Sequence, residues 1–151
     1  MPATKKRTTA NARKPSLTLL GSGTTPLPAS PDAARLEIFA NTHPDRDYEI
    51  SFDCPEFTAL CPITGQPDFG HITITYIPDR RCLESKSLKL YLGSFRNQGT
   101  FHEAVVNRIR DDIVKVSAPR RLTVTGQFKP RGGISIRVTA AYTASKRTSH
   151  G

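Results

Sequence analysis

The stretch FGHITITYIPDRRCLESKSLKLYLGSF, residues 69–95, contains the change of pattern that decides the fold. Over residues 69–77 apolar and polar side chains alternate, which is typical of a β-strand, and the apolar phase is made by Ile72, Ile74 and Tyr76. Over residues 85–95 the apolar side chains recur at helical spacing instead: Leu88, Leu92 and Phe95. A strand followed closely by a helix predicts a mixed domain.

Alternation also occurs on both sides of this stretch. Residues 46–53 alternate and predict a strand, and residues 54–68, rich in proline and glycine, predict the loop that follows it. Two further strands are expected near the carboxyl end, around Leu122, Val124 and Phe128, and around Ile134, Ile136 and Val138. The segment 129–133, KPRGG, is expected to form the turn between them.

A second helix is predicted after the break at residues 97–99, NQG. Thr100 is its expected N-cap, with Glu103 completing a capping box, and Ala118-Pro119 ends it. Its apolar face is Phe101, Val105, Ile109, Ile113 and Val116. The resulting order, β-β-α-α-β-β, predicts one α+β domain with an antiparallel sheet and helices on one face. The two exposed edges of such a sheet make pairing between subunits a hypothesis, against coverage by the terminal segments.

The length of 151 residues suits one domain, and the formal net charge of +9 is concentrated at the two ends. We expect residues 1–15 to form a disordered basic arm, residues 16–145 the folded domain, and residues 146–151 a disordered tail. The arm is either a solubilising tail or a contact for nucleic acid. No aromatic side chain interrupts its charges, so it offers no base stacking.

The three cysteines, Cys54, Cys61 and Cys82, match no common zinc spacing. The amino end lacks the apolar segment of a secretory signal, and no apolar run is long enough to cross a membrane. We therefore expect a cytoplasmic protein with free thiols, without a metal and without membrane contact.

The clearest candidate for chemistry is Cys61, in a loop beside Pro62 and Gly65. A cysteine is the strongest side-chain nucleophile near neutral pH once it is a thiolate. Asp68, at the start of the next strand, is placed to exchange protons with a ligand there. The alternative is structural: Cys61 as a small buried apolar residue, and Asp68 as a turn residue.

Four charged residues near the two helix starts form a second group of candidates. Lys86 and Lys89 lie three apart in the first helix, near free backbone N–H groups, which suits a phosphate. Glu84 and Glu103 either cap the helices or converge on a ligand whose N–H groups a carboxylate accepts. His102 is either solvated or a proton carrier.

Three segments together resemble one enzyme family: CPEFTALCPITGQPDF at 54–69, LESKSLKLYLGSFRNQGTFHE at 83–103 and FKPRGGISI at 128–136. This combination is similar to the 7-cyano-7-deazaguanine (preQ0) reductases, the NADPH-dependent nitrile reductases of queuosine biosynthesis, in their short single-domain form. The resemblance runs from about residue 17 to residue 143. It implies a tunnelling (T-) fold and rings of subunits, as two stacked pentamers with active sites between neighbours.

The resemblance also implies a role for each site residue. Cys61 would attack the nitrile carbon to form a thioimide, and Asp68 would donate protons. The substrate would be held by Leu83, Glu84, Ser85, His102 and Glu103. Lys86 and Lys89 would bind the phosphates of NADPH, no metal is implied, and no direct contact with nucleic acid is required.

Two alternatives are a T-fold hydrolase related to the GTP cyclohydrolases, and an RNA-binding module led by the basic arm. The first class typically needs zinc ligands, whose spacing is absent from this sequence. The second would depend on residues 1–15, which lie outside the resemblance.

Overall fold

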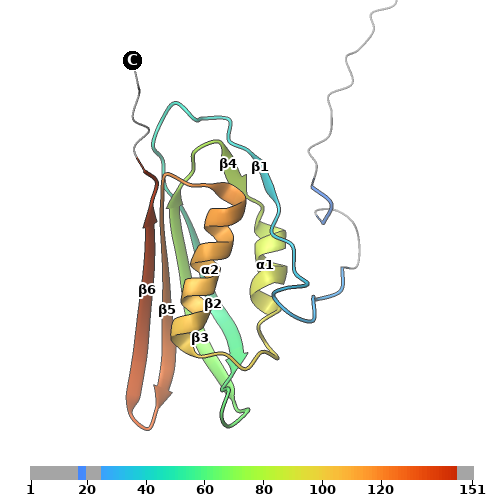
Figure 1. The fold of residues 1–151 in the computed structure, drawn as a ribbon, viewed down its shortest axis with the longest axis vertical. Coiled ribbons are helices and arrows are strands. Elements are labelled where there is room, and N and C mark those ends of the chain that lie inside the picture. The colour runs from blue at the N-terminus through green and yellow to red at the C-terminus, as the bar shows by residue number, and fades with distance from the viewer. Residues whose placement is uncertain (1–16, 20–24, 146–151) are drawn as a thin grey trace, which may run out of the picture.

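The computed structural model of the chain describes residues 17–19 and 25–145. Within these residues the elements follow the order expected from the sequence, with two short strands added (Figure 1). They are β1 (Ile38–Ala40), β2 (Ile50–Leu60), β3 (Pro67–Ile77), β4 (Arg81–Leu83), α1 (Ser85–Gly93), α2 (His102–Ser117), β5 (Arg121–Arg131) and β6 (Ile134–Thr143). The basic arm 1–15 and the tail 146–151 lie outside the described residues.

The main sheet is antiparallel and has the strand order β2-β3-β5-β6. Helix α2 packs on β5 and β6 and α1 lies against β2, so both helices cover one face. The short strands β1 and β4 pair with each other and form a separate small sheet. The predicted α+β class and the helix-covered face are therefore confirmed, and the small sheet is an addition.

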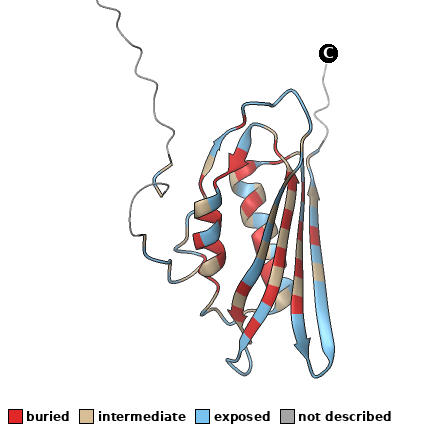
Figure 2. Cartoon of the chain, turned by 180° about the vertical axis from the view of Figure 1, so that it is seen from behind, coloured by how far each residue is buried: buried red, intermediate tan, exposed pale blue. Residues whose placement is uncertain are grey.

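The alternating and helical patterns identified most of the core correctly. Ile72, Ile74 and Tyr76 of β3 are buried, as are Leu88, Leu92 and Phe95 around α1. In α2 the buried positions include Val105, Ile109 and Ile113. Figure 2 shows buried positions recurring along β3 and β5 but few along β6, where only Ala140 is buried. The second edge strand is thus largely exposed in the single chain.

The predicted loop at 54–68 is wrong in its bounds, because β2 continues to Leu60 and β3 begins at Pro67. The pairing of β2 with β3 shifts register between Cys54 and Phe57, so Pro55 lies in a β-bulge of an edge strand. A proline there costs no ladder hydrogen bond, and the strand passes through it. The same strand also begins later than expected, at Ile50 rather than at residue 46.

The turn predicted at 129–133 is shorter in the structure, because here too a strand continues past a proline. The pairing of β5 with β6 shifts between Phe128 and Arg131, so Pro130 lies within an irregular part of the strand. The turn itself is Gly132-Gly133, and both residues have positive φ, +56° and +78°. Two glycines with positive φ form the type of two-residue turn that matches the twist of a hairpin.

The predicted capping box of α2 is also wrong. Its N-cap is Phe101, which makes no side-chain cap hydrogen bond. The backbone N–H of Thr100 instead donates to the Leu60 carbonyl, because residues 98–100 run beside the end of β2. As a result Phe101, which was expected on the buried face, is 58% exposed.

The two helices begin at opposite ends of the domain (Figure 1). Helix α1 begins beside β4, and α2 begins at the end where the two hairpins turn. A helix of nine residues spans about 13 Å, which sets the scale of this separation. Residues 83–85 and residues 102–103 therefore lie far apart within one chain.

Candidate functional site

Cys61 begins the tight loop that joins β2 to β3. Its N–H donates to the carbonyl of Gln66 (2.8 Å), and its own carbonyl accepts from the N–H of Gly65 (2.9 Å). These two bonds close the loop on itself, and the thiol is half-buried at its base. The loop therefore holds the sulfur at a fixed place, at the end of the sheet.

The surroundings of this thiol favour its reactive form. A hydrogen bond from the Thr64 hydroxyl, followed by the backbone N–H groups of Thr64 and Ile63, lowers the pKa of Cys61. Partial burial and the charge of Asp68 act in the opposite direction, and the hydrogen bonds outweigh them. Since donors that point at a sulfur stabilise the thiolate, the loop suits a nucleophilic cysteine.

Asp68 lies near the start of β3 and is almost completely buried. Its carboxylate has two partners from other elements: His102 Nε2 lies 3.3 Å from Oδ2, and Arg131 Nε lies 2.7 Å from Oδ1. The His102 side chain is itself only 13% exposed. Residues from β3, from the start of α2 and from the end of β5 thus meet at one carboxylate.

The plane of the His102 ring is fixed by Phe128, whose ring stacks on it at 3.8 Å with an interplanar angle of 3°. Phe128 fits there because two glycines leave room. A Cβ at Gly70 would lie 2.8 Å from the Phe128 ring, and one at Gly126 would lie 2.7 Å from Val106 and 2.8 Å from Phe128. These close approaches explain why neither glycine can carry a side chain without a shift of its neighbours.

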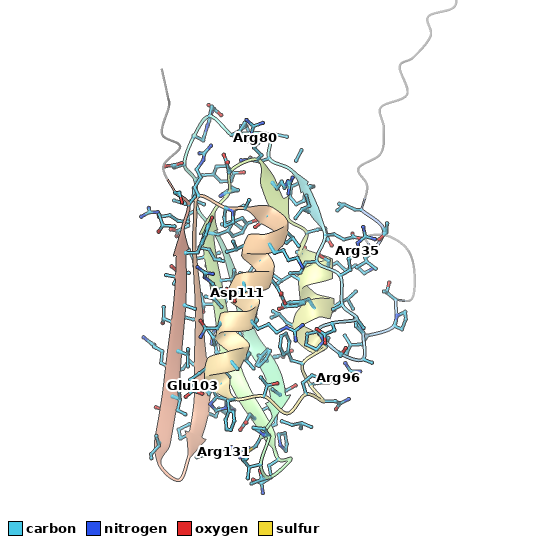
Figure 3. The ribbon with its side chains drawn as sticks, viewed as in Figure 1. Arg35, Arg80, Arg96, Glu103, Asp111 and Arg131 are labelled. Carbon is cyan, nitrogen blue, oxygen red and sulfur yellow. The ribbon has the colours of Figure 1, made fainter. Side chains whose placement is uncertain are left out.

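Glu103 follows His102 and is exposed, at the same end of the molecule as Arg131 (Figure 3). Within the described residues, its carboxylate makes no hydrogen bond or ion pair, because the capping box does not form. An acid in the first turn of a helix is favoured by the helix dipole and leaves both oxygens available to a ligand. Glu103 therefore has the freedom that a substrate-binding carboxylate needs.

Glu84 has the opposite character. It is the N-cap of α1, where one carboxylate oxygen accepts from the N–H of Lys86 (2.7 Å) and the other from the N–H of Ser87 (2.8 Å). The side chain is buried. A carboxylate has about four acceptor positions, so capping uses only part of its capacity.

Beside Glu84 lies a mostly apolar hollow of about 640 Å³. Leu83 reaches it from the end of β4, Ser85 from the start of α1, and Phe39 from β1. The other walls come from Leu17, Ala40, Ile50, Phe52 and Tyr76. The predicted substrate residues 83–85 are therefore grouped around a concave surface, away from Cys61.

The two lysines of α1 point to different surroundings. Lys86 Nζ donates to the carbonyl of Leu19 (2.5 Å), whereas Lys89 lines a second hollow of about 560 Å³ between α1 and the bulged part of β2. Cys54 also reaches that hollow. Both lysines lie in the first five residues of one helix, and lysine side chains suit phosphate groups, although the structure does not bring these two amino groups together.

The structure thus groups the candidates into two sets. Cys61, Asp68, His102 and Glu103 lie at one end of the domain, while Leu83, Glu84 and Ser85 lie at the other. Sequence reasoning missed two contributors to the first set, Arg131 and Phe128, although a basic residue next to a Gly-Gly turn was a visible signal.

All three cysteines are free thiols, and no group of metal-ligating side chains occurs within residues 17–19 and 25–145. In that part of the chain no helix is long and apolar enough to span a membrane.

Comparison with known proteins places these residues in a family. Residues 67–147 match the family model described as QueF-like protein. The NADPH-dependent 7-cyano-7-deazaguanine reductase of Streptococcus thermophilus is 61% identical over 120 residues, which is 80% of this chain and 74% of that protein. The enzyme of the same name from an Anaeromyxobacter species is 59% identical over 116 residues, 77% of this chain and 94% of that protein.

A solved structure supports the fold at much lower sequence identity. The crystal structure of the archaeosine synthase QueF-Like in the apo form aligns with a TM-score of 0.57 at 19% identity, covering 66% of this chain and 95% of that one. That likeness concerns the fold alone. The family model and the high identities over most of each chain show that this chain belongs to the QueF-like family of the NADPH-dependent 7-cyano-7-deazaguanine reductases.

Proposed function

We propose that this protein reduces the nitrile of 7-cyano-7-deazaguanine to the aminomethyl group with NADPH, as a step of queuosine biosynthesis for tRNA. The observation that carries the proposal is the Cys61 thiol, surrounded by hydrogen-bond donors and close to a buried carboxyl group, Asp68. Membership of the reductase family supports the choice of substrate and cofactor.

In this mechanism the Cys61 thiolate adds to the nitrile carbon. A C–S bond forms, one C–N π bond opens, and the nitrogen takes, through the Asp68 carboxylate, the proton that the Cys61 thiol released, which gives a thioimide. Covalent addition divides a difficult reduction into easier steps, because a thioimide accepts hydride more readily than a nitrile does. His102, 3.3 Å from Asp68, is placed to return a proton to that carboxylate. Cys61 regains its thiolate when the C–S bond breaks.

The cofactor residues in this proposal are Lys86 and Lys89. Lys89 is exposed beside the hollow between α1 and β2, and Lys86 lies one turn earlier, so both fit the phosphates of NADPH. NADPH, when bound, supplies the two hydrides that each nitrile requires. Lys86 exchanges its bond to the Leu19 carbonyl for one to phosphate in this arrangement.

We further propose that the complete site forms between subunits of a ring, built as two stacked pentamers. Within one chain Glu84 and Cys61 lie at opposite ends of the domain, so a single subunit cannot present both to one small substrate. The strands β2 and β6 end the sheet on either side, and their joining between subunits would close the ring. The folded domain would be residues 16–145, with the free thiols suited to the cytoplasm.

The test is an assay of the purified protein with 7-cyano-7-deazaguanine and NADPH, with Cys61→Ala as the matched variant. We expect the wild type to consume two NADPH per nitrile and Cys61→Ala to consume none while keeping its unfolding temperature. Intact-mass analysis without NADPH should show a covalent adduct on the wild type alone. Turnover by Cys61→Ala would exclude the covalent route, and no turnover by folded, reduced wild type would exclude the activity.

A further inference from the structure

We propose that Arg131 is a positioning residue for this reaction, which holds the Asp68 carboxylate and the end of β3 in place beside Cys61. The inference rests on the proposed function, because it assigns Arg131 a part in the proton transfer made by Asp68. It concerns a residue of the second hairpin that touches neither Cys61 nor the hollow beside Glu84.

The backbone alone does not fix Asp68 on the side of β5. The pairing of β3 with β5 ends at Gly70 and Phe128, two residues before Asp68 is reached. On its other side Asp68 is paired with Ala59 of β2, which is itself an edge strand. Contacts across the gap to β5 must therefore come from side chains.

Arg131 crosses that gap with one ion pair and one hydrogen bond. Its Nε lies 2.7 Å from Asp68 Oδ1, and its Nη2 donates to the carbonyl of Pro67 at 2.7 Å. One planar guanidinium thus binds the carboxylate and the peptide group that precedes it. Arginine is suited to this, because its donors form a rigid fork, whereas lysine offers only a point charge on a flexible stem.

The hairpin places Arg131 where it can make both bonds. The register shift after Phe128 and the Gly132-Gly133 turn bring Arg131 opposite Ile134 at the tip. Both hairpin tips lie at the same end of the sheet (Figure 1), so a side chain from one reaches the base of the other. The Arg131 side chain stays 41% exposed, so it is held by these bonds more than by packing.

Charge gives Arg131 a second effect on the same site. The groups that face Asp68 are Arg131 from β5, His102 from α2 and the thiol of Cys61, with Glu103 next to His102. The charge of Asp68 raises the pKa of the Cys61 thiol. A guanidinium bonded to Asp68 offsets part of that charge, so its removal disfavours the thiolate.

The experiment compares Arg131→Gln and Arg131→Lys with a matched control, Arg137→Gln. Arg137 lies on the same hairpin and bonds Gln127 instead of Asp68. For Arg131→Gln we expect kcat to fall roughly ten- to hundredfold, as for a misplaced reacting group, with KM for NADPH unchanged. Arg131→Lys should recover part of this loss, and Arg137→Gln should match the wild type. Unfolding temperature confirms that each variant is folded.

Two readouts separate positioning from other roles. Without NADPH, the pH at which the Cys61 adduct forms at half its maximal rate should rise in Arg131→Gln. In a variant that already carries Asp68→Asn, adding Arg131→Gln should lower activity little further, because the effect of Arg131 passes through Asp68.

Three outcomes would overturn the inference while wild-type turnover left the proposed function standing. The first is an unchanged kcat in Arg131→Gln. The second is a double variant whose loss of activity equals the combined losses of Arg131→Gln and Asp68→Asn. The third is a raised KM for NADPH with normal adduct formation, which would make Arg131 a cofactor-binding residue. Absence of wild-type turnover would instead reject the function itself.

Discussion

The two ends of α1 contrast in what they offer a ligand. The Cys61 end (Cys61, Asp68, His102, Glu103 and Arg131) is polar, and the contacts of Asp68 with His102 and Arg131 link three separate elements there. The Glu84 end (Leu83, Glu84 and Ser85, with the 640 Å³ hollow) is mostly apolar, and its one carboxylate already caps a helix. One end carries the proposed reacting groups, and the hollow at the other end has no cysteine among its lining residues.

The proposed groups for recognition and for chemistry are thus separated within one chain, which supports the proposal that assembly of subunits joins them. A flat heteroaromatic base buries its faces against apolar walls, as at the Glu84 end, while its reacting nitrile needs the thiol and the proton donor. The contrast between the ends is therefore the structural reason for proposing a site shared between subunits.

The largest effect comes from mixing two inactive variants. Cys61→Ala removes the nucleophile at one end, and Glu84→Gln weakens recognition at the other. If neighbours share a site, unfolding and refolding the two together should give about a quarter of sites with both native residues, as heterologous contacts between randomly mixed subunits require. Recovery of NADPH consumption measures this, and refolding each variant alone is the control. Continued inactivity of a mixed, folded oligomer would show that each site lies within one chain.

A smaller loss is expected from filling the space beneath the Phe128 ring. Gly126→Ala places a Cβ 2.7 Å from Val106 and 2.8 Å from Phe128, and overpacking of this kind costs about 1–3 kcal/mol of unfolding free energy. Because Phe128 carries the His102 ring, adduct formation should slow as well. Urea unfolding and intact-mass kinetics measure the two effects. The control is Thr123→Ala, an exposed position of the same strand, and equal losses from both variants would refute the packing argument.

The smallest effect concerns the Thr64 hydroxyl alone. This hydrogen bond is the largest contribution lowering the pKa of Cys61, so Thr64→Val should raise that pKa. A thiol becomes a thiolate only as the pH rises through its pKa, so the rate of adduct formation should reach half its maximum at a higher pH. The plateau at high pH should be unchanged, since the thiolate itself is intact. Thr64→Ser, which keeps the hydroxyl, is the control, and identical pH profiles for valine and serine would remove Thr64 from this role.

Much of the fold followed from short-range patterns. Alternation around Ile74 and helical spacing around Ile109 each report a side chain that faces the core, so strands and helices were predicted with their buried faces. The patterns failed at Pro55 and Pro130, where bulges let strands continue through prolines that normally end them. They also missed β1 and β4, whose three residues are too few to show a period.

The candidate site likewise combines a contact that the sequence predicts with contacts that it does not. Cys61 and Asp68 lie seven residues apart, on either side of the short loop between β2 and β3, so their pairing could be inferred from sequence. The contact between Asp68 and Arg131 joins residues from different hairpins, and it depends on a side chain that crosses a gap in strand pairing. The separation of Glu84 from Glu103 likewise depends on the antiparallel course of α1 and α2, which residue spacing does not report.

The stacking of His102 on Phe128 has a spectroscopic consequence. Protons that lie over the face of an aromatic ring experience its induced magnetic field and resonate upfield of their usual positions. With the rings parallel and 3.8 Å apart, the imidazole protons of His102 should be displaced in this way. The chain has only four histidines, so this signal should be resolvable and would be lost on replacing Phe128 with leucine. His102 thereby provides a built-in magnetic resonance marker, which reports movement at the Cys61 end without any attached label.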